Sequence, residues 1–385
     1  MKRKVLIVAS TASMIKQFNI RNIKILNSLG YEIHVAANFK KPGTITSELA
    51  RKLVEKLVES DVVVHNVDFA RGMGDFKHNF IAINQLIYIF RKNKFEFVHT
   101  QAALSSVLTR LVAPFFNVRV LYTIHGMQFS KESSLFRWIL FFPIELILSV
   151  VTYATIVINE DDERIVKKYF FTKCFRVNGV GIDYYRFINN DKIKSQTHSR
   201  ILITVGELSK RKNQKMVIKA LANLKKYDWR YLVVGIGSSK DELQELASSL
   251  NIADRIKFTG YSENIAELYQ QADVAIFASY LEGLLTAGME AMASGIPSVY
   301  SDVRGIRDIL EDGKTGFKID QLTVESMTET LKKMFETSSE ELIKMGDAAR
   351  KVAQQFDKKN IDKDMIEIYE LMGKGNVSRW TKNIH

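Results

Sequence analysis

Two stretches of this chain follow the same pattern and strongly limit what it can fold into. Each begins with a basic residue, continues with β-branched and apolar residues and ends in small residues: KVLIVAS at 4–10 and RILITVG at 200–206. A helical pattern and then another apolar strand follow each of them. This succession is typical of βαβ units, whose strands form a parallel sheet. The sequence therefore predicts an α/β protein with two Rossmann-like βαβ domains.

The first half contains a series of short apolar segments that are separated by helical patterns. Strands are predicted at 5–9, 32–36, 62–67, 97–100, 118–123 and 154–158, and helices at 19–29, 46–59 and 79–92. Ligands of open parallel sheets bind at the loops that follow the strands. Those loops are residues 10–13, 37–38, 69–74, 99–101, 125–127 and 159–162.

The length of 385 residues also favours two domains, because single cores rarely grow that large. A polar, lysine-containing stretch at 189–199 is predicted to be a linker. We therefore expect an N-terminal domain at 1–188, a C-terminal domain at 189–355 and a closing helical segment at 356–385.

The composition excludes several classes of protein. Cys174 is the only cysteine, so a disulfide framework is excluded, a reducing compartment is favoured and no Cys/His cluster has zinc spacing. Residues 1–190 carry 26 Lys and Arg against 15 Asp and Glu, or +11 of the net charge of +12. A basic surface can attract nucleic acid, anionic lipid or a diphosphate. No zinc finger, helix-turn-helix or RNP-like aromatic set accompanies it, and we therefore expect no nucleic-acid partner.

The stretch at 281–300, LEGLLTAGMEAMASGIPSVY, carries the strongest functional signal. Glu282 precedes an apolar loop and a short helical run that ends at Gly295 and Pro297. The start of such a helix offers N–H groups and a positive dipole end, which suit a diphosphate. Glu282 and Glu290 flank this site, and their carboxylates would accept hydrogen bonds from hydroxyls attached to the phosphate, such as those of a sugar. The alternative is a surface loop with two solvated glutamates.

The spacing and its frame resemble the E-x7-E motif of retaining family 4 glycosyltransferases. The matching positions are Glu282, Gly283, Glu290, Ala291, Met292, Ala293, Gly295 and Pro297. Stretches such as RVLYTIHGMQF, INEDD and GVGIDYYRF extend the likeness over nearly the whole chain, and it is greatest to the EpsD-like capsular and exopolysaccharide glycosyltransferases. The resemblance implies a GT-B fold, in which two Rossmann-like domains face a central cleft and a C-terminal helix crosses back to the N-terminal domain. The N-terminal domain would hold the acceptor and the C-terminal domain the nucleotide sugar.

Histidines follow two of the predicted strands of the first half. His125, in TIHGMQF, resembles the family histidine that lies beside the donor sugar near the reacting centre, although a structural loop histidine is the alternative. His99 and Thr100, in VHTQ, resemble the family's acceptor-side stretch.

The second half begins with VGELSKRKNQ, in which Lys212 precedes a helical pattern at 216–224. The family usually has G-R-L-x-x-x-K here, with both cations on the donor phosphates. Lys212 matches the lysine, but Glu207 stands where the arginine is expected. Neutralisation of the diphosphate would then depend on Lys212, on Arg211 or Lys210, and on the helix dipole.

Further donor-binding residues are implied by the resemblance at Gly181, Gly237, Tyr261, Leu285 and Thr286. Gly181 lies in NGVGIDYYRF, which an ordinary tight turn would also explain. Gly237 belongs to a Gly-x-Gly loop that is incomplete as a dinucleotide fingerprint, because Lys240 occupies the third glycine position. Tyr261 would lie near the base, and Leu285 and Thr286 begin the helix at the diphosphate.

The reaction that the resemblance implies is transfer of a hexosyl or N-acetylhexosaminyl group from a UDP-linked sugar with retention of configuration. His125 and Glu282 would act on the sugar, Glu290 would anchor the ribose, and Lys212 would stabilise the departing diphosphate. No metal and no cofactor is expected. We find no strand-end Asp-x-Asp, and Asp362 and Asp364, in a predicted terminal helix, are expected to be solvated.

The stretch at 135–158 is apolar enough to be mistaken for a membrane span, but Arg137, Pro143 and Glu145 interrupt it. We expect a buried helix followed by a strand. The alternative is an amphipathic face that enters the membrane interface through the side chains of Phe136, Trp138, Phe141 and Phe142. That alternative suits the expected partners, an undecaprenyl-diphosphate-linked saccharide acceptor and the inner leaflet surface, and a cytoplasmic, peripheral location.

Three other functions compete with this interpretation. A nucleotide-sugar epimerase would share the architecture but carry different acids. A nicotinamide-dependent oxidoreductase would need a complete glycine fingerprint. A non-catalytic protein that binds lipid surfaces would keep the basic N-terminal half and would tolerate loss of Glu282 or Lys212.

Overall fold

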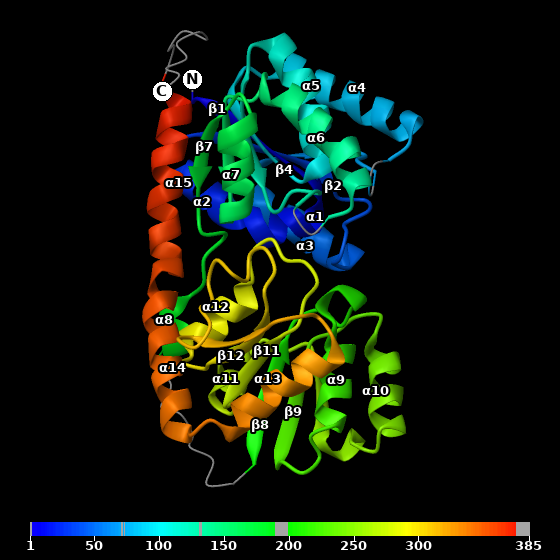
Figure 1. The fold of residues 1–385 in the computed structure, drawn as a ribbon. Coiled ribbons are helices and arrows are strands. Elements are labelled where there is room, and N and C mark those ends of the chain that lie inside the picture. Colours follow the sequence, from blue (N-terminus) through cyan, green and yellow to red (C-terminus); the bar gives the residue numbers. More distant parts are fainter. Residues whose placement is uncertain (1, 71, 73, 131–132, 189–198, 375–385) are drawn as a thin grey trace. The chain divides into compact units, whose positions relative to one another are not determined.

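The computed structural model describes residues 2–70, 72, 74–130, 133–188 and 199–374 (Figure 1). The chain divides into two compact units, Met1–Val177 with Ile361–His385, and Asn178–Asn360. The predicted linker at 189–199 lies outside the described residues except for Ser199.

The first unit is built on a parallel sheet in the order β3-β2-β1-β4-β5-β6-β7. Its strands are β1 (Lys4–Thr11), β2 (Glu32–Asn38), β3 (Val63–Asn66), β4 (Phe95–Gln101), β5 (Arg119–Ile124), β6 (Ala154–Val157) and β7 (Lys173–Arg176). Strand β1 pairs with both β2 and β4, so the order of the strands reverses there, and ligands of open parallel sheets bind near such a point. The six predicted strands are confirmed within a few residues, and β7 was not predicted.

Helices cover both faces of this sheet. They are α1 (Ala12–Met14), α2 (Ile20–Ser28), α3 (Ser47–Glu59), α4 (Phe76–Lys92), α5 (Ala103–Val112), α6 (Leu135–Ser149) and α7 (Glu160–Tyr169), with the π-helical turn η1 (Ile15–Asn19) and the 3-10 turn η2 (Ala113–Phe116). Polar N-caps fix several starts: Thr46, Asp75 and Asn159 accept hydrogen bonds from the first turns of α3, α4 and α7. One buried cluster lies against α2 and α3, and another against α4 and α5.

The second unit repeats the plan with a parallel sheet in the order β10-β9-β8-β11-β12-β13. Its strands are β8 (Arg200–Val205), β9 (Trp229–Val234), β10 (Ile256–Gly260), β11 (Val274–Phe277), β12 (Ser298–Ser301) and β13 (Gly316–Ile319). Its helices and 3-10 turns are α8 (Tyr184–Ile188), η3 (Lys210–Lys212), α9 (Gln214–Ala222), α10 (Lys240–Ser249), η4 (Ala253–Arg255), α11 (Ile265–Gln270), α12 (Thr286–Ala293), α13 (Val324–Glu336), α14 (Ser339–Ala353) and η5 (Gln354–Phe356). Here the order reverses between β8 and β11, which are hydrogen-bonded neighbours.

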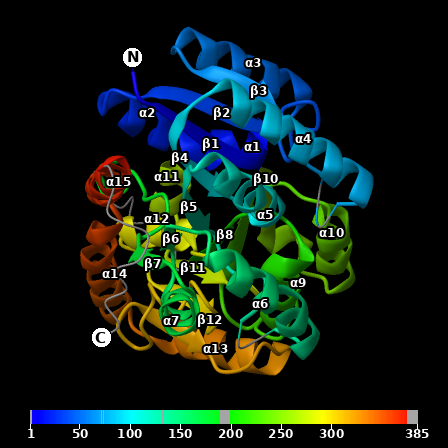
Figure 2. The same ribbon diagram turned by 90° about the horizontal axis from the view of Figure 1, so that it is seen from above.

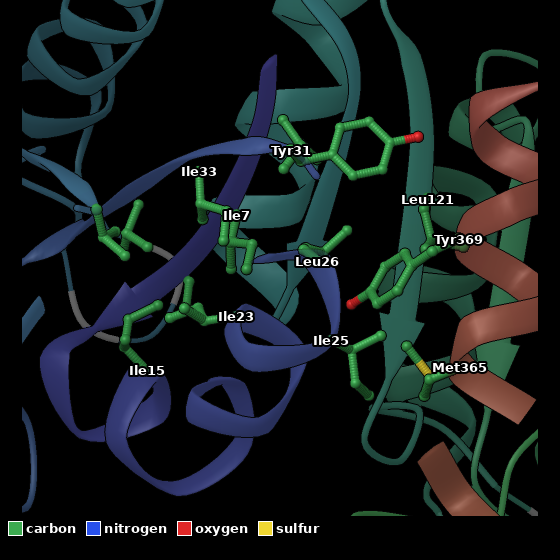
Figure 3. Close-up of a cluster of buried hydrophobic side chains, with 14 of the residues drawn as sticks. Ile7, Ile15, Ile23, Ile25, Leu26, Tyr31, Ile33, Leu121, Met365 and Tyr369 are labelled. Carbon is green, nitrogen blue, oxygen red and sulfur yellow. The ribbon is translucent and has the colours of Figure 1, made fainter. Parts of the chain in front are cut away.

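The last helix, α15 (Lys358–Gly373), begins in the second unit, and its residues from Ile361 onward belong to the first. Figure 3 shows Met365 and Tyr369 of α15 beside Ile25 of α2 and Leu121 of β5, within one buried cluster. Asp362 is only partly solvated, because its carboxylate accepts two hydrogen bonds from Arg21, the second of them at 2.7 Å between Nη2 and Oδ2.

The apolar stretch at 135–158 forms α6 and β6, but α6 is not the buried helix that the sequence suggested. Leu135, Phe136, Ile139 and Ile147 are each at least two-thirds exposed, and among the described side chains of α6 only Leu148 and Ser149 are buried. Phe141 and Phe142 pack against a buried cluster instead. No helix among the described residues is both long and apolar enough to cross a membrane.

Candidate active site

The loops that follow β8 and β11 meet at the point where the strand order of the second sheet reverses. The first loop carries η3 and the second carries Glu282. Lys212 Nζ lies 2.7 Å from Glu282 Oε1, and Arg211 Nη1 lies 3.0 Å from Glu282 Oε2. The two oxygens of one carboxylate therefore hold two different cations.

Glu282 is buried, with 7% of its surface exposed. Burial alone would raise the pKa of its carboxyl group. The charges of Lys212 and Arg211, together with hydrogen bonds from Lys212 and Ser279, outweigh burial and hold the pKa below its usual value. Glu282 is therefore ionised at neutral pH, and the cluster of Glu282, Lys212 and Arg211 carries a net charge of +1.

The family usually has a second cation, an arginine, at the position of Glu207. In this chain Arg211 places a second cation on Glu282 instead. Its Nη1 also donates to the Leu281 carbonyl at 2.9 Å, and its own carbonyl accepts from the Tyr280 N–H. Glu207 itself is exposed, and its Oε2 lies 3.8 Å from Arg211 Nη2. The guanidinium group is thus held against the loop of Glu282 from the side of η3.

Glycines allow the neighbouring loops to pack backbone to backbone. A Cβ at Gly237 would overlap the carbonyl of Leu208, and a Cβ at Gly235 would overlap the carbonyl of Gly206. The Leu208 N–H donates to Ile236 at 3.0 Å, and the Ser239 N–H donates to Leu208 at 3.1 Å. The loop of Gly235 and Gly237 can therefore pack against the loop after β8 only because both residues are glycines. This structural requirement holds even if Gly237 binds no ligand.

Helix α12 begins at Thr286 without a side-chain cap. Its entry differs from the expected row of available N–H groups, since Leu285 donates to the Gly305 carbonyl at 3.3 Å and Thr286 to the Leu284 carbonyl at 3.1 Å. The Leu285 side chain is buried, and the Tyr269 hydroxyl donates to the Ala287 carbonyl at 2.7 Å. What this helix end offers in the structure is its dipole, the Thr286 side chain and the N–H of Ala287, which has no partner among the described residues.

Glu290 lies one turn into α12 and is partly buried. Burial raises the pKa of its carboxyl group to about 7, although the charges of Arg186 and Lys358 act in the opposite direction. Among the described residues, no side chain forms a hydrogen bond or ion pair with this carboxylate. Glu290 is thus desolvated and, unlike Glu282, unpaired.

Two other predicted donor residues lie on loops of the second unit. Gly181 adopts a left-handed conformation with φ of 68° next to Ile182, which exchanges main-chain hydrogen bonds with Phe356 and Lys358. Tyr261 follows β10, and 71% of its surface is exposed.

In the first unit His125 lies just after β5. It lies beside the last residue of β4 and beside the π-helical turn η1. Its Nε2 lies 2.8 Å from Oε1 of Gln101, the last residue of β4. Its ring packs on Phe18 of η1, with the ring centroids 4.5 Å apart. Burial lowers the pKa of His125 to about 4, so the imidazole is neutral at physiological pH.

His99 and Thr100 are fully buried in β4. His99 Nδ1 lies 2.8 Å from the Tyr369 hydroxyl and Nε2 lies 2.7 Å from the Thr123 hydroxyl, so both ring nitrogens are occupied. The Thr100 hydroxyl donates to Ser106 at 3.2 Å. A role for this pair in acceptor binding stays a prediction, and it would have to act through neighbouring residues.

Two family models match the chain, one in each half. The model described as Glycosyltransferase Family 4 matches residues 22–184, and the model described as Glycosyl transferases group 1 matches residues 186–352. This chain belongs to glycosyltransferase family 4. The resemblance that rested on the frame around Glu282 and Glu290 is confirmed.

Several curated relatives of this glycosyltransferase are known. The Bacillus subtilis (strain 168) protein EpsD is 29% identical over 385 residues, which cover 96% of this chain and 97% of that protein. The UDP-Gal:alpha-D-GlcNAc-diphosphoundecaprenol alpha-1,3-galactosyltransferase of Escherichia coli is 24% identical and is matched over 64% of this chain and 68% of its own. The N-acetylgalactosamine-N,N'-diacetylbacillosaminyl-diphospho-undecaprenol 4-alpha-N-acetylgalactosaminyltransferase of Campylobacter jejuni is 30% identical and is matched over 44% and 46%.

Solved structures share the fold of this glycosyltransferase. Anabaena HepE, crystallised with UDP and glucose, superimposes with a TM-score of 0.75 at 16% identity, covering 96% of this chain and all of that one. WaaG, a glycosyltransferase involved in lipopolysaccharide biosynthesis, gives a TM-score of 0.67 at 15% identity, covering 94% and 99%. With the two parallel sheets, these similarities confirm the predicted GT-B class.

The structure of the glycosyltransferase brings together Lys212 and Glu282 as the sequence predicted, and Arg211, one of the two further cations that the sequence named, joins them. The sequence did not indicate Asn19, Phe18 or Gln101 around His125. The one signal for Gln101 in the sequence was its place in the predicted strand-end loop at 99–101, where polar residues are candidates for a ligand site. Among the described residues, no group of three or more His, Cys, Asp or Glu could hold a metal ion.

Proposed function

We propose that this chain transfers a hexosyl or N-acetylhexosaminyl group from a UDP-linked sugar to an undecaprenyl-diphosphate-linked saccharide, with retention of configuration and without a metal. The observation that carries the proposal is the buried, ionised Glu282 held between Lys212 and Arg211. Two cations fixed on one carboxylate leave a net positive charge at a strand switch point, where a diphosphate can bind.

Lys212 and Arg211 bind the diphosphate in this proposal. Departure of the nucleoside diphosphate develops negative charge on a phosphate oxygen, and preorganised cations in a partly buried site stabilise that charge strongly. Only 14% of the Lys212 side chain is exposed, so its ammonium group is already largely desolvated. Glu282 keeps both cations in place and uses its remaining lone pairs to accept from hydroxyls of the transferred sugar, and the dipole of α12 adds to the positive potential.

We assign Glu290 to the ribose diol and His125 to a hydroxyl of the transferred sugar. A desolvated carboxylate without a partner is suited to accept two hydrogen bonds from vicinal hydroxyls, because each charge-assisted bond replaces lost hydration. Neutral His125 can accept or donate a hydrogen bond to a sugar hydroxyl. The remaining donor residues in this proposal are Gly181, Gly237, Tyr261, Leu285 and Thr286.

The names of relatives support the substrate classes. The Escherichia coli relative is named for a UDP-linked galactose donor and a diphosphoundecaprenol acceptor, and the Campylobacter jejuni relative for a diphospho-undecaprenol acceptor. Both substrates are of the classes that we propose here.

A panel of nucleotide sugars tests the donor class. We expect UDP-linked sugars to raise the melting temperature, because a ligand that binds the folded state stabilises it by mass action, by about 2.7 kcal/mol at a concentration of 100 times Kd. Incubation with radiolabelled donor in the absence of acceptor distinguishes a glycosyltransferase from a nucleotide-sugar epimerase. Only the epimerase would convert the donor to a new nucleotide sugar. Stabilisation by reduced nicotinamide cofactors and by no nucleotide sugar would refute the proposal.

A peripheral location on the cytoplasmic membrane face is supported by three neighbouring helices of the first unit. Helix α4 contacts α5 and η2, and α5 contacts α6 (Figure 2). Exposed apolar side chains on these elements include Phe76 (99% exposed), Phe115 (87%), Leu135 (74%), Phe136 (71%), Ile139 (67%) and Phe80 (65%). We call these six side chains the α4–α6 face.

The charges beside the α4–α6 face suit an anionic bilayer. Lys77, Arg91 and Lys92 of α4 are exposed, and α4, α5 and η2 contain no acidic residue. The acid of α6, Glu145, binds the buried Arg110 at 2.8 Å. Apolar side chains next to an excess of cations are typical of surfaces that enter the interface of anionic membranes.

Flotation with vesicles tests this location. We expect the chain to bind vesicles that contain anionic phospholipid, and replacement of Phe76, Phe80, Phe115 and Phe136 by serine to weaken binding at least about tenfold. The control is replacement of Val58 and Phe171 by serine, because these two apolar side chains are exposed elsewhere on the first unit. Equal binding of the quadruple variant and the wild type would refute the membrane role of the α4–α6 face.

A further inference from the structure

Two buried side-chain amides, those of Asn19 and Gln101, form a chain of hydrogen bonds that ends at His125. Gln101 Oε1 lies 2.8 Å from His125 Nε2, and Gln101 Nε2 donates to Asn19 Oδ1 at 2.6 Å. Asn19 is fully buried and Gln101 is 1% exposed. Side-chain amides buried this deeply require partners, and here each of them has one on both sides.

Main-chain carbonyls fix the direction of this chain. Asn19 Nδ2 donates to the Met14 carbonyl at 3.3 Å, so its amide oxygen must face the other way, towards Gln101. Asn22 Nδ2 donates to the Phe18 carbonyl at 3.2 Å and to Asn19 Oδ1 at 3.3 Å, which confirms that orientation. A carbonyl can only accept, so turning either asparagine amide round would place two oxygens against each other. Gln101 must then direct its NH₂ group to Asn19 and its oxygen to His125.

An oxygen facing His125 Nε2 requires that this nitrogen carry the proton. The neutral ring then has its lone pair on Nδ1, for which no partner exists among the described residues. We infer that Asn19 and Gln101 are positioning residues, which hold His125 as the Nε2–H tautomer so that Nδ1 accepts a hydrogen bond from a substrate hydroxyl. The identity of that hydroxyl, on the transferred sugar, rests on the proposed function, but the tautomer does not.

The backbone supports this arrangement at two unusual places. Phe18 and Asn19 are consecutive residues of the π-helical turn η1, so one irregular turn supplies both the ring that packs on His125 and the amide that orients Gln101. Such turns occur often at functional sites. On the other side, Ala102 follows Gln101 with φ of 72° and ψ of 156°, a conformation that strains a residue with a side chain.

The surroundings keep the ring of His125 neutral. The other histidine beside Gln101 is His99, whose Nε2 lies 3.5 Å from Gln101 Nε2 and whose pKa burial lowers to about 3. Phe18 covers the ring of His125 on one side. No carboxylate among the described residues bonds to Asn19, Gln101 or His125, so nothing in this cluster favours the doubly protonated imidazolium ion.

Nitrogen NMR of the chain labelled with ¹⁵N-histidine tests the tautomer directly. We expect the signals that are lost in His125→Ala to report a protonated Nε2 and an unprotonated Nδ1 near pH 7. Gln101→Leu removes the acceptor and is expected to allow both tautomers. Tyr369→Phe is the matched control, since it removes one hydroxyl from the same buried network, at His99, and is expected to leave His125 unchanged. A protonated Nδ1 in the wild type would overturn the inference.

Kinetics separates positioning from a merely structural effect. We expect Gln101→Leu to lower kcat about 10- to 100-fold with little change in KM for the donor, as for other residues that orient a functional group, while Tyr369→Phe stays within about threefold of the wild type. Gln101→Glu places a carboxylate at Nε2 and raises the pKa of His125. The kcat of this variant should therefore fall as the pH is lowered, over a pH range in which the kcat of the wild type stays constant. Wild-type kcat and pH profiles in both Gln101 variants would overturn the positioning role. If the wild type transfers no sugar, the NMR result still decides the tautomer.

Discussion

Replacement of Lys212 by alanine is expected to lower kcat/KM for sugar transfer by about a thousandfold or more. Lys212 supplies the charge closest to Glu282, at 2.7 Å, and in the proposed reaction it meets the negative charge that develops on the leaving diphosphate. Loss of one preorganised group of this kind typically costs 10²- to 10³-fold. Here the buried Glu282 would also lose its principal counter-charge, so its pKa would rise. Steady-state kinetics with the preferred UDP-linked sugar measures the effect.

A matched control is available three residues further along the chain. Lys215 is exposed, and its Nζ lies 2.6 Å from Glu242 on the surface. Lys215→Ala should retain nearly wild-type kinetics, because exposed ion pairs contribute little. Glu282→Gln should lose transfer as Lys212→Ala does, while circular dichroism shows the native fold for both. Full activity of either variant would remove the cluster of Glu282, Lys212 and Arg211 from the mechanism.

Replacement of Glu290 by glutamine is expected to stabilise the protein and to weaken nucleotide binding. Burial raises the pKa of Glu290 from 4.5 to about 7, so the folded state favours the neutral acid. The stability that this group contributes is present below pH 4.5 and is lost as the pH rises through about 7. Glutamine removes the cost of ionisation, so the free energy of unfolding at pH 8 should rise by about 1–3 kcal/mol, with a much smaller gain at pH 5. Denaturant unfolding at both pH values measures the difference.

The same substitution should weaken UDP binding about 10- to 100-fold, since charge-assisted hydrogen bonds to the ribose become neutral ones. In the wild type, affinity should increase between pH 6 and 8 as Glu290 ionises. The groups that act on Glu290 are Arg186 and Lys358, together with Tyr269, whose own pKa burial raises. Glu267→Gln, an exposed change on the neighbouring helix α11, is the control for both measurements. Undiminished UDP affinity in Glu290→Gln would contradict its role at the ribose.

The fold could be predicted because its signals are local and repeated. Runs of β-branched residues followed by helical patterns predicted two parallel sheets. The meeting of Lys212 and Glu282 was also predictable, because both follow strands whose loops converge where the strand order reverses.

The remaining features depend on contacts between residues far apart in the chain. The sequence left open whether Arg211 or Lys210 is the further cation, and the contact of Arg211 with Glu282 appears only in the structure. The ion pair of Asp362 was missed because its partner, Arg21, is distant in sequence. Helix α6 was expected to be buried because its composition is apolar, but hydropathy does not reveal which side chains a neighbouring element covers. The π-helical turn η1 has no recognised sequence signature, so the surroundings of His125 could not be predicted.

Transfer of label from a radioactive UDP-linked sugar to an undecaprenyl-diphosphate-linked saccharide tests the central claim most directly. The account predicts that label enters the lipid fraction with the wild-type chain, that the new linkage keeps the configuration of the donor by NMR, and that Lys212→Ala transfers at most about a thousandth as fast under the same conditions. Equal labelling of the lipid fraction by the wild type and Lys212→Ala would contradict it.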